Sequence, residues 1–164
     1  PVIDSEGDDY ETFRAALSRV TSYLCQSIAR DGEGATKLLR CTVQGAASKA
    51  AAAGIAKAII RSPLVKCAMF GADANWGRVL CAIGYSGERV DVNKVALSFS
   101  SSAGEVEVCR NGRGMPFSEE LAKKVLSREE ITIAVTLGDG GGAATAYGCD
   151  LSYDYVRING DYRS

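Results

Sequence analysis

Segments with a helical spacing of apolar residues alternate along this chain with short runs rich in β-branched residues. Apolar residues recur at steps of three or four between residues 10 and 28, which predicts an amphipathic helix. Residues 36–43 are rich in β-branched residues and leucine and predict a strand. The alanine-rich residues 46–60 predict a second helix, which stops at Ser62-Pro63. This alternation predicts an α/β protein.

The rest of the chain continues the pattern without a repeat or a low-complexity linker. We therefore expect a single domain over residues 1–164, of α/β class with a mixed sheet. The further predicted elements are a buried strand over 64–70, a short helix over 79–84, a hairpin of strands 95–100 and 105–110, a helix over 119–126 capped by Ser118, strands over 131–137 and 143–150, and a terminal helix over 152–158.

The composition argues against several classes of function. Nineteen Lys and Arg residues against twenty Asp and Glu give a net charge of −1, which is not the basic footprint of a nucleic-acid-binding protein. The chain has no histidine, so it cannot by itself supply a His base, a Ser-His-Asp triad or a His-ligated metal. No run approaches the roughly 20 apolar residues of a membrane helix. We expect no nucleic acid, membrane or metal partner. Because the chain begins with proline, we also expect a longer functional unit.

The six cysteines are widely spaced and include no Cys-x-x-Cys pair, which argues against a zinc ribbon or a redox motif. Most lie in apolar segments, so we expect free, buried thiols in a cytosolic protein. They are Cys25, Cys41, Cys67, Cys81, Cys109 and Cys149.

Two short patterns have both a functional and a structural interpretation. Gly138-x-Gly140-x-x-Ala143 follows a predicted strand, as in a dinucleotide fingerprint, but a phosphate site requires a helix directly after the glycines. Residues 143–148 have the character of a strand, so we expect a glycine-permitted turn or bulge. Pro1 resembles the terminal amine base of a tautomerase. The acidic residues that follow favour a protonated amine, so a cut chain end is the preferred interpretation.

Two loops combine glycines with polar groups. In Asp31-Gly32-Glu33-Gly34-Ala35-Thr36-Lys37, two glycines flank a carboxylate at a helix-to-strand junction. This loop is either a surface turn or a rigid support for Glu33. Residues 71–78 are interpreted first as helix capping by Asp73 or Asn75, and second as a binding loop.

The C-terminal segment, residues 149–164, is dense in polar and aromatic residues, whereas chain ends are usually plain and frayed. We therefore expect it to be docked. Asn159 offers both a donor and an acceptor, and Ser164 offers a hydroxyl beside the terminal carboxylate.

Together these segments resemble the ornithine acetyltransferases, the bifunctional glutamate N-acetyltransferase / amino-acid acetyltransferase enzymes of arginine biosynthesis. The chain departs from the family at Ala74, where a proline usually stands. The resemblance rests on three motifs, in the same order over nearly the whole chain: Asp31-Gly32-Glu33-Gly34-Ala35-Thr36-Lys37, Ser62-Pro63-Leu64-Val65-Lys66 leading into Asn75-Trp76-Gly77-Arg78, and Cys149-Asp150-Leu151-Ser152-Tyr153-Asp154-Tyr155-Val156-Arg157-Ile158-Asn159.

The resemblance implies a specific chemistry. The family precursor cleaves itself into an α and a β chain and frees a threonine, which carries acetyl from N-acetylornithine to glutamate with its own amine as base. The chain resembles the C-terminal part of the β chain, so the nucleophile and the oxyanion-hole residues are expected upstream and the isolated piece is expected to be inactive. The resemblance implies three substrate-binding residues. Glu33 suits the ornithine ammonium group, and Asn159 and Ser164 suit the amino-acid carboxylate or amine.

The resemblance also implies partners and an architecture. The complete fold is expected to be an αββα sandwich, to which the α chain and the upstream part of the β chain contribute the remaining elements. The expected assembly is α2β2. N-acetylornithine, ornithine and glutamate are the expected ligands, acetyl-CoA is a co-substrate of some members, and no cofactor or metal is expected. From the residues alone, a non-catalytic small-molecule-binding or interaction domain is the alternative.

Overall fold

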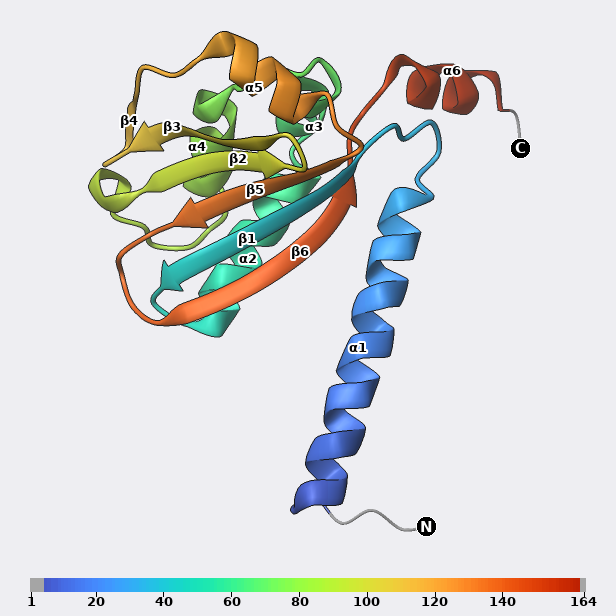
Figure 1. Ribbon diagram of the computed structural model, residues 1–164, viewed down its shortest axis with the longest axis vertical. Coiled ribbons are helices and arrows are strands. Elements are labelled where there is room, and N and C mark those ends of the chain that lie inside the picture. The colour runs from blue at the N-terminus through green and yellow to red at the C-terminus, as the bar shows by residue number, and fades with distance from the viewer. Residues whose placement is uncertain (1–4, 163–164) are drawn as a thin grey trace.

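The sheet joins strands that are distant in the sequence. The computed structural model describes residues 5–162, and its six strands lie in the order β4-β3-β2-β5-β1-β6 (Figure 1). Strands β1 (Leu38–Ala46) and β5 (Glu130–Thr136) are parallel, and the other described pairs are antiparallel. The predicted α/β class with a mixed sheet is confirmed. The other strands are β2 (Ala96–Ser101), β3 (Gly104–Arg110), β4 (Arg113–Gly114) and β6 (Gly142–Cys149).

One face of the sheet forms the hydrophobic core. Cys41 pairs with Ile133 in the register, and Ile133 pairs in turn with Phe99. Phe99 also pairs with Val106, and all four side chains are buried. Because alternate residues of a strand point to opposite faces, this row places the apolar halves of four strands on the same side.

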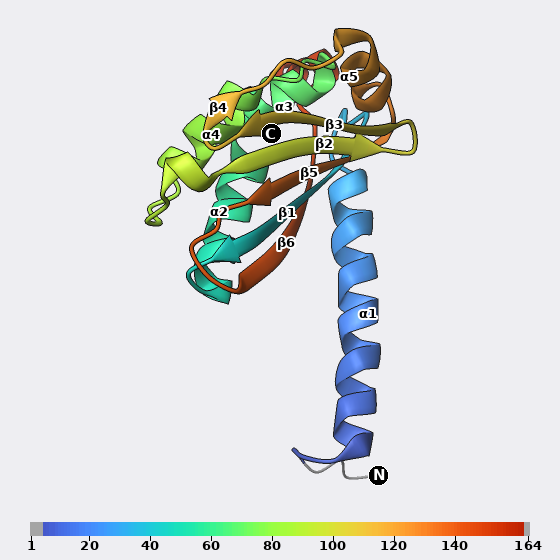
Figure 2. The same cartoon turned by 60° about the vertical axis from the view of Figure 1, so that its left-hand side comes forward.

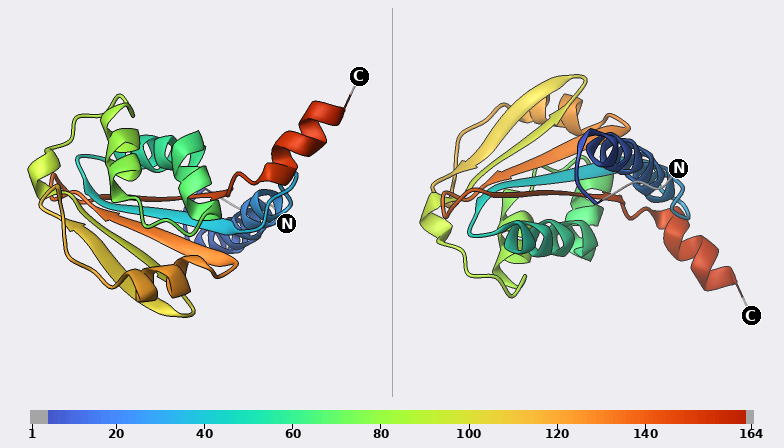
Figure 3. Two further views of the ribbon diagram at one scale, coloured as in Figure 1. Left: turned by 90° about the horizontal axis from the view of Figure 1, so that it is seen from above. Right: turned by 90° about the horizontal axis from the view of Figure 1, so that it is seen from below.

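Four helices contribute buried side chains to this core. Figure 3 shows three of them, α2, α3 and α4, together on one side of the sheet. Ser118 caps α5 by accepting a hydrogen bond from the amide of Leu121, which confirms that predicted helix start. The helices are α2 (Lys49–Arg61), α3 (Pro63–Phe70), α4 (Trp76–Gly84) and α5 (Glu119–Leu126), with a short 3-10 turn at Val92–Lys94.

The prediction of a buried strand over residues 64–70 is wrong, because this segment is helix α3. Ser62 accepts a hydrogen bond from the amide of Val65, and Pro63 occupies the first turn, where its missing N–H is harmless. Val65, Ala68 and Met69 are buried at helical spacing. Ser62-Pro63 therefore both ends α2 and starts α3. Its second role was not part of the prediction.

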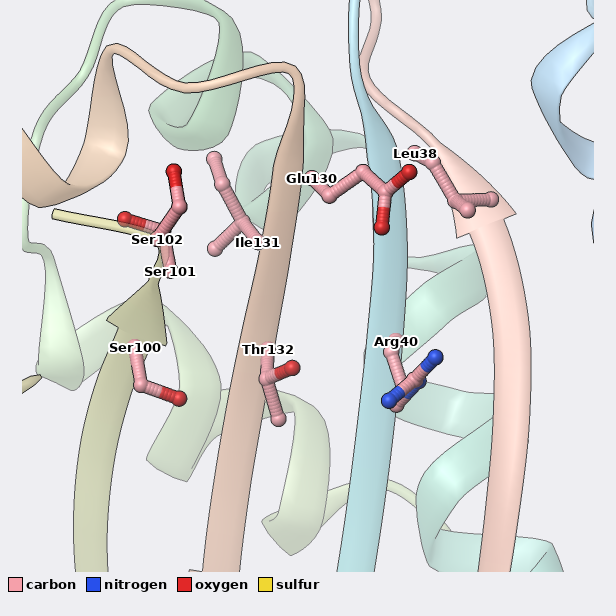
Figure 4. A pocket seen from close by; sticks show the side chains of 8 residues that line it. All are labelled: Leu38, Arg40, Ser100, Ser101, Ser102, Glu130, Ile131 and Thr132. Atoms are coloured by element: carbon pink, nitrogen blue, oxygen red, sulfur yellow. The ribbon is translucent and has the colours of Figure 1, made fainter. Parts of the chain in front are cut away.

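The other face of the sheet is polar. A single row across five strands runs Tyr147, Arg40, Thr132, Ser100, Glu105. Figure 1 looks onto this face with α2 behind the sheet, and Figure 4 shows Arg40, Thr132 and Ser100 side by side on three strands. The Arg40 guanidinium lies 5.7 Å from the centre of the Tyr147 ring, and its buried Nε has no hydrogen-bond partner among the described residues.

Helix α1 (Asp8–Arg30) extends away from the sheet (Figures 1 and 2). The predicted helix is confirmed, but none of its residues is buried. Its apolar stripe, defined here as Phe13, Leu17, Val20, Leu24 and Ile28, is at least 50% exposed at every position. No helix within residues 5–162 is long and apolar enough to cross a membrane.

The C-terminal helix α6 (Tyr153–Asp161) contacts the rest of the described chain through its surface. Ser152 caps it, and the Tyr153 ring meets the Phe70 ring edge-on at 5.4 Å between centroids. No residue of α6 is buried, so the helix is docked through surface contacts, at its first turn and at Asn159, and not through a buried face.

The expectation of buried thiols is wrong for most of the six cysteines, although all six are free. Only Cys41 and Cys109 are buried, and burial raises the pKa of the Cys41 thiol to about 12. Cys67 and Cys81 lie on the outward sides of α3 and α4. An apolar segment that forms a surface helix leaves one side in solvent, whereas a buried strand does not.

The glycine-rich run after β5 is a turn, as predicted. Strand β6 begins at Gly142 with no intervening helix, so the phosphate cradle of a dinucleotide site is absent from this described segment. Gly138 and Gly45 both have positive φ angles, and a side chain on Gly45 would lie 2.9 Å from the amide nitrogen of Gly138. The two backbones approach closely at the bulge between β1 and β6.

Candidate substrate-binding site

Glu33 and Asn159 meet, although 126 positions separate them in the sequence. The Nδ2 amide of Asn159 donates to Oε2 of Glu33 at 2.9 Å and to the carbonyl of Tyr155 at 2.9 Å. Both side chains are exposed. With both amide hydrogens used, the pair presents the Glu33 carboxylate and the Asn159 Oδ1 as acceptors. This arrangement suits a positively charged amine better than a carboxylate.

The loop that carries Glu33 fits closely against the start of α6. Gly34 has a φ of 67°, and a Cβ there would lie 2.6 Å from the amide nitrogen of Tyr155. A Cβ on Gly32 would lie 2.7 Å from the Sγ of Cys149. Only glycine allows both the turn and the approach at Gly34, which favours the rigid-support interpretation of this motif.

The buried carboxylate of Asp150 anchors the end of the same loop. Its Oδ1 accepts the amides of Thr36 at 2.8 Å and Lys37 at 2.9 Å, and its Oδ2 accepts the Thr36 hydroxyl at 2.5 Å. Two residues later, the hydroxyl of Ser152 donates to the carbonyl of Gly34 at 2.5 Å. The segment from β6 to α6 therefore holds the loop from the residue next to Glu33 to the start of β1.

Lys37 ties the beginning of β1 to the ends of two helices. Its Nζ donates to the carbonyls of Met69 and Phe70 in α3 and of Leu126 in α5, at 2.5, 3.2 and 2.8 Å. Helix C-termini leave carbonyls unpaired, and an ammonium group satisfies them. Burial lowers the pKa of Lys37, and the Asp150 charge partly opposes that shift.

The loop before α4 is a capping structure, which was the first of its two interpretations. The Oδ1 of Asn75 accepts the amide of Arg78 at 3.2 Å, and its Nδ2 donates to Asp73 at 3.0 Å. The Arg78 guanidinium donates to the carbonyl of Leu64 at 3.0 Å, which fixes α4 against α3.

Two predicted functional residues, Ser164 and Pro1, lie outside the described residues. Within residues 5–162, no group of three or more Cys, Asp or Glu side chains is arranged to hold a metal ion. The structure thus brings together two of the three predicted substrate-binding residues.

The sequence reasoning did not identify the residues that support this pair. Asp150, Ser152 and Lys37 all stand within the quoted motifs but had no assigned role. One signal was available for Asp150 and Ser152. Asp150 ends a predicted strand, and Ser152 begins a predicted helix, so both stand at a junction where polar side chains satisfy free backbone groups.

The fold and this site define a mixed α/β protein whose first loop and last helix are joined by a carboxylate–amide pair. The ArgJ family model matches residues 3–164, so the chain belongs to the ArgJ family. The predicted resemblance to the ornithine acetyltransferases is confirmed.

Relatives with the same description are similar over the whole chain. The arginine biosynthesis bifunctional protein ArgJ 1 of Clostridium acetobutylicum is 52% identical over 99% of this chain. The protein ArgJ of Staphylococcus aureus is 47% identical over 99% of it. The chain spans 40% and 38% of the length of these two relatives. The crystal structure of the arginine biosynthesis bifunctional protein argJ from Bacillus halodurans matches with a TM-score of 0.91 and 42% identity, covering 99% of this chain and 75% of that one.

Proposed function

We propose that this chain forms the ornithine-binding part of an acetyltransferase that moves acetyl from N-acetylornithine to glutamate in arginine biosynthesis. The observation that carries the proposal is the contact between Glu33 and Asn159. Two motifs that were singled out separately in the sequence contribute one residue each to it. The names of the relatives, which describe bifunctional proteins of arginine biosynthesis, support the same pathway.

The chemistry of the pair suits the side chain of ornithine. An alkyl ammonium group has three hydrogens to donate and requires acceptors. Glu33 supplies a negative charge and Asn159 supplies a neutral oxygen, while the hydrogen bond between them keeps the carboxylate in place. In this proposal Asn159 accepts from the amine, and Ser164 contributes its hydroxyl to the amino-acid end of the substrate.

In this proposal the acetyl group is carried by a threonine nucleophile outside this chain, next to oxyanion-hole residues that also lie outside it. The chain therefore binds and orients substrate but performs no transfer when isolated. Acetyl-CoA is proposed as a second donor for glutamate, without a bound cofactor, and the cytoplasm as the location.

The substitution Glu33→Gln in the full-length protein that contains this chain is expected to raise the KM for N-acetylornithine roughly 10- to 100-fold, because it removes a charge-assisted contact with the ammonium group. The value of kcat should change much less, because the contact is equally present before and during transfer. Steady-state kinetics with varied N-acetylornithine and fixed glutamate measure both parameters.

The matched control is Glu120→Gln on helix α5. Glu120 is exposed and pairs with Lys124 within its own helix, so its loss should leave the KM unchanged. Ornithine-dependent turnover that is the same in Glu33→Gln and in the unsubstituted enzyme would remove the assignment of Glu33.

We further propose that the part of the family polypeptide that this chain does not span, including the α chain, covers the apolar stripe of α1 and the polar sheet face in an αββα, α2β2 assembly. Two observations support this partner. The stripe is exposed along a 23-residue helix, and the matched relatives have more than half of their length outside this chain. In proteins, most of the stability of an amphipathic helix comes from packing of its apolar face rather than from intrinsic helix propensity.

Amide hydrogen exchange tests this partner directly. The amides of α1 should exchange at least about tenfold more slowly in the full-length protein than in the 164-residue chain, because a covered helix opens less often. Helix α5 already packs on the core and serves as the internal control with similar exchange in both samples. Equal exchange of α1 in both samples, or protection of the isolated chain that rises with its concentration, would contradict the proposed partner.

A further inference from the structure

The carboxylate of Asp150 is 2% exposed and has no role in the substrate contacts proposed above. It accepts three hydrogen bonds, all from the loop that carries Glu33. A buried charge is unfavourable unless hydrogen bonds replace its hydration, so these three contacts are what keep a carboxylate at this position.

The contacts of Asp150 and Ser152 hold the part of the loop that directly follows Glu33. Asp150 holds Thr36 and Lys37 on the C-terminal side of the loop, and Ser152 holds the carbonyl of Gly34. Ser152 is also the cap of α6, the helix that carries Asn159. One short segment therefore sets the position of both members of the pair.

The remaining contacts of this region leave Asp150 as the main anchor of the loop end. The Nζ of Lys37 is directed to three backbone carbonyls of α3 and α5, not to the Asp150 carboxylate. Helix α6 has no buried residue, and its contact with α3 is the edge-on packing of the exposed Tyr153 ring on Phe70. If the Asp150 contacts weaken, Glu33 and Asn159 can separate without disturbing the core.

We infer that Asp150 is a positioning residue for the ornithine-binding pair, and that it acts through Glu33 by holding the loop against the start of α6. The inference rests on the proposed function and adds to it the residue that sets the geometry. Asp150 does not touch the substrate. Its contribution is the reduced freedom of the Glu33 carboxylate before substrate arrives.

The test is a double-mutant cycle in the full-length protein with Asp150→Asn and Glu33→Gln. Asparagine keeps an oxygen for the two amides and loses the charge, so the fold should be retained. Asp150→Asn alone should raise the KM for N-acetylornithine about tenfold, which corresponds to the loss of one charge-assisted hydrogen bond, and change kcat less than about twofold. In the Glu33→Gln background, the same substitution should change the KM less than about twofold, because residues that act through one another are not additive.

Asp139→Asn is the matched control. Asp139 also accepts a backbone amide, that of Asp91, and pairs with Lys94. Its substitution should leave the KM unchanged. A readout without activity is the exchange of the Thr36 and Lys37 amides, which Asp150→Asn should accelerate while the amides of α2 keep their rates.

The outcomes separate this inference from the proposed function. A KM that does not respond to Glu33→Gln removes the ornithine assignment itself. If Glu33→Gln raises the KM but Asp150→Asn does not, the positioning role alone is overturned. The same holds if the effects of the two substitutions on the KM are additive in the double mutant. A fall in kcat and in the melting temperature with an unchanged KM also overturns it, because Asp150 would then serve the fold and not the site.

Discussion

Replacing Phe99 by alanine is expected to lower the free energy of unfolding by about 3–5 kcal/mol. Within residues 5–162, Phe99 is the largest of the fully buried side chains, and it stands between Ile133 and Val106 in the central row of the sheet. Its removal leaves a cavity that the neighbouring strands cannot close, because their register is fixed on both sides. Urea unfolding of the 164-residue chain, followed by circular dichroism, measures the change.

The matched control is Phe13→Ala on α1, where the same ring is 51% exposed. Its loss should change the free energy of unfolding by about 0.5 kcal/mol or less. If Phe99→Ala changes the free energy of unfolding as little as Phe13→Ala does, Phe99 does not lie in the core of the sheet.

Replacing Gly34 by alanine is expected to raise the KM for N-acetylornithine on the order of 100-fold in the full-length protein, because displacements near 1 Å at a site have effects of this size. The added methyl would lie 2.6 Å from the Tyr155 nitrogen and 2.9 Å from the Asp154 carbonyl carbon. Both are backbone atoms, so α6 must move away from the loop and Asn159 moves with it.

The effect on global stability should be smaller, about 1–2 kcal/mol for a non-glycine residue at positive φ. Gly141→Ala is the control, since a Cβ at Gly141 meets no atom within 4 Å. It should leave the KM unchanged. A Gly34→Ala enzyme with the unaltered KM would contradict the close contact between the loop and α6.

The sequence predicted most elements because local signals and packing agree in them. The hairpin of β2 and β3 and the capped helix α5 follow from alternation and from Ser118. Residues 64–70 were mispredicted because a short apolar run has no decisive periodicity, and the Ser62-Pro63 start signal was used only as a stop. The exposure of the α1 stripe depends on which parts of a protein surround it, which no pattern within the helix reports.

The candidate site was predicted in part for a similar reason. Glu33 was marked by its two flanking glycines, and Asn159 by a polar C-terminal segment. Their contact is a tertiary property, set by the bend of the chain between β6 and α6. The position of Asp150 at a strand end indicates a polar contact but not its partners, because the Thr36 and Lys37 groups that it binds lie 114 and 113 positions away in the sequence.

The strand order has a consequence for how this chain is made. Strand β1 lies between β5 and β6, so residues 47–129 must be synthesised before it gains its parallel partner. At ordinary rates of translation this takes about 4 to 17 seconds, during which both edges of β1 are free to pair with other chains. The hairpin of β2 and β3 can form early, but the pairing of β1 with β5 in the middle of the sheet cannot form until β5 has been synthesised. Nascent chains released before β6 is complete should therefore aggregate, and folding on the ribosome should be limited by the arrival of the last two strands.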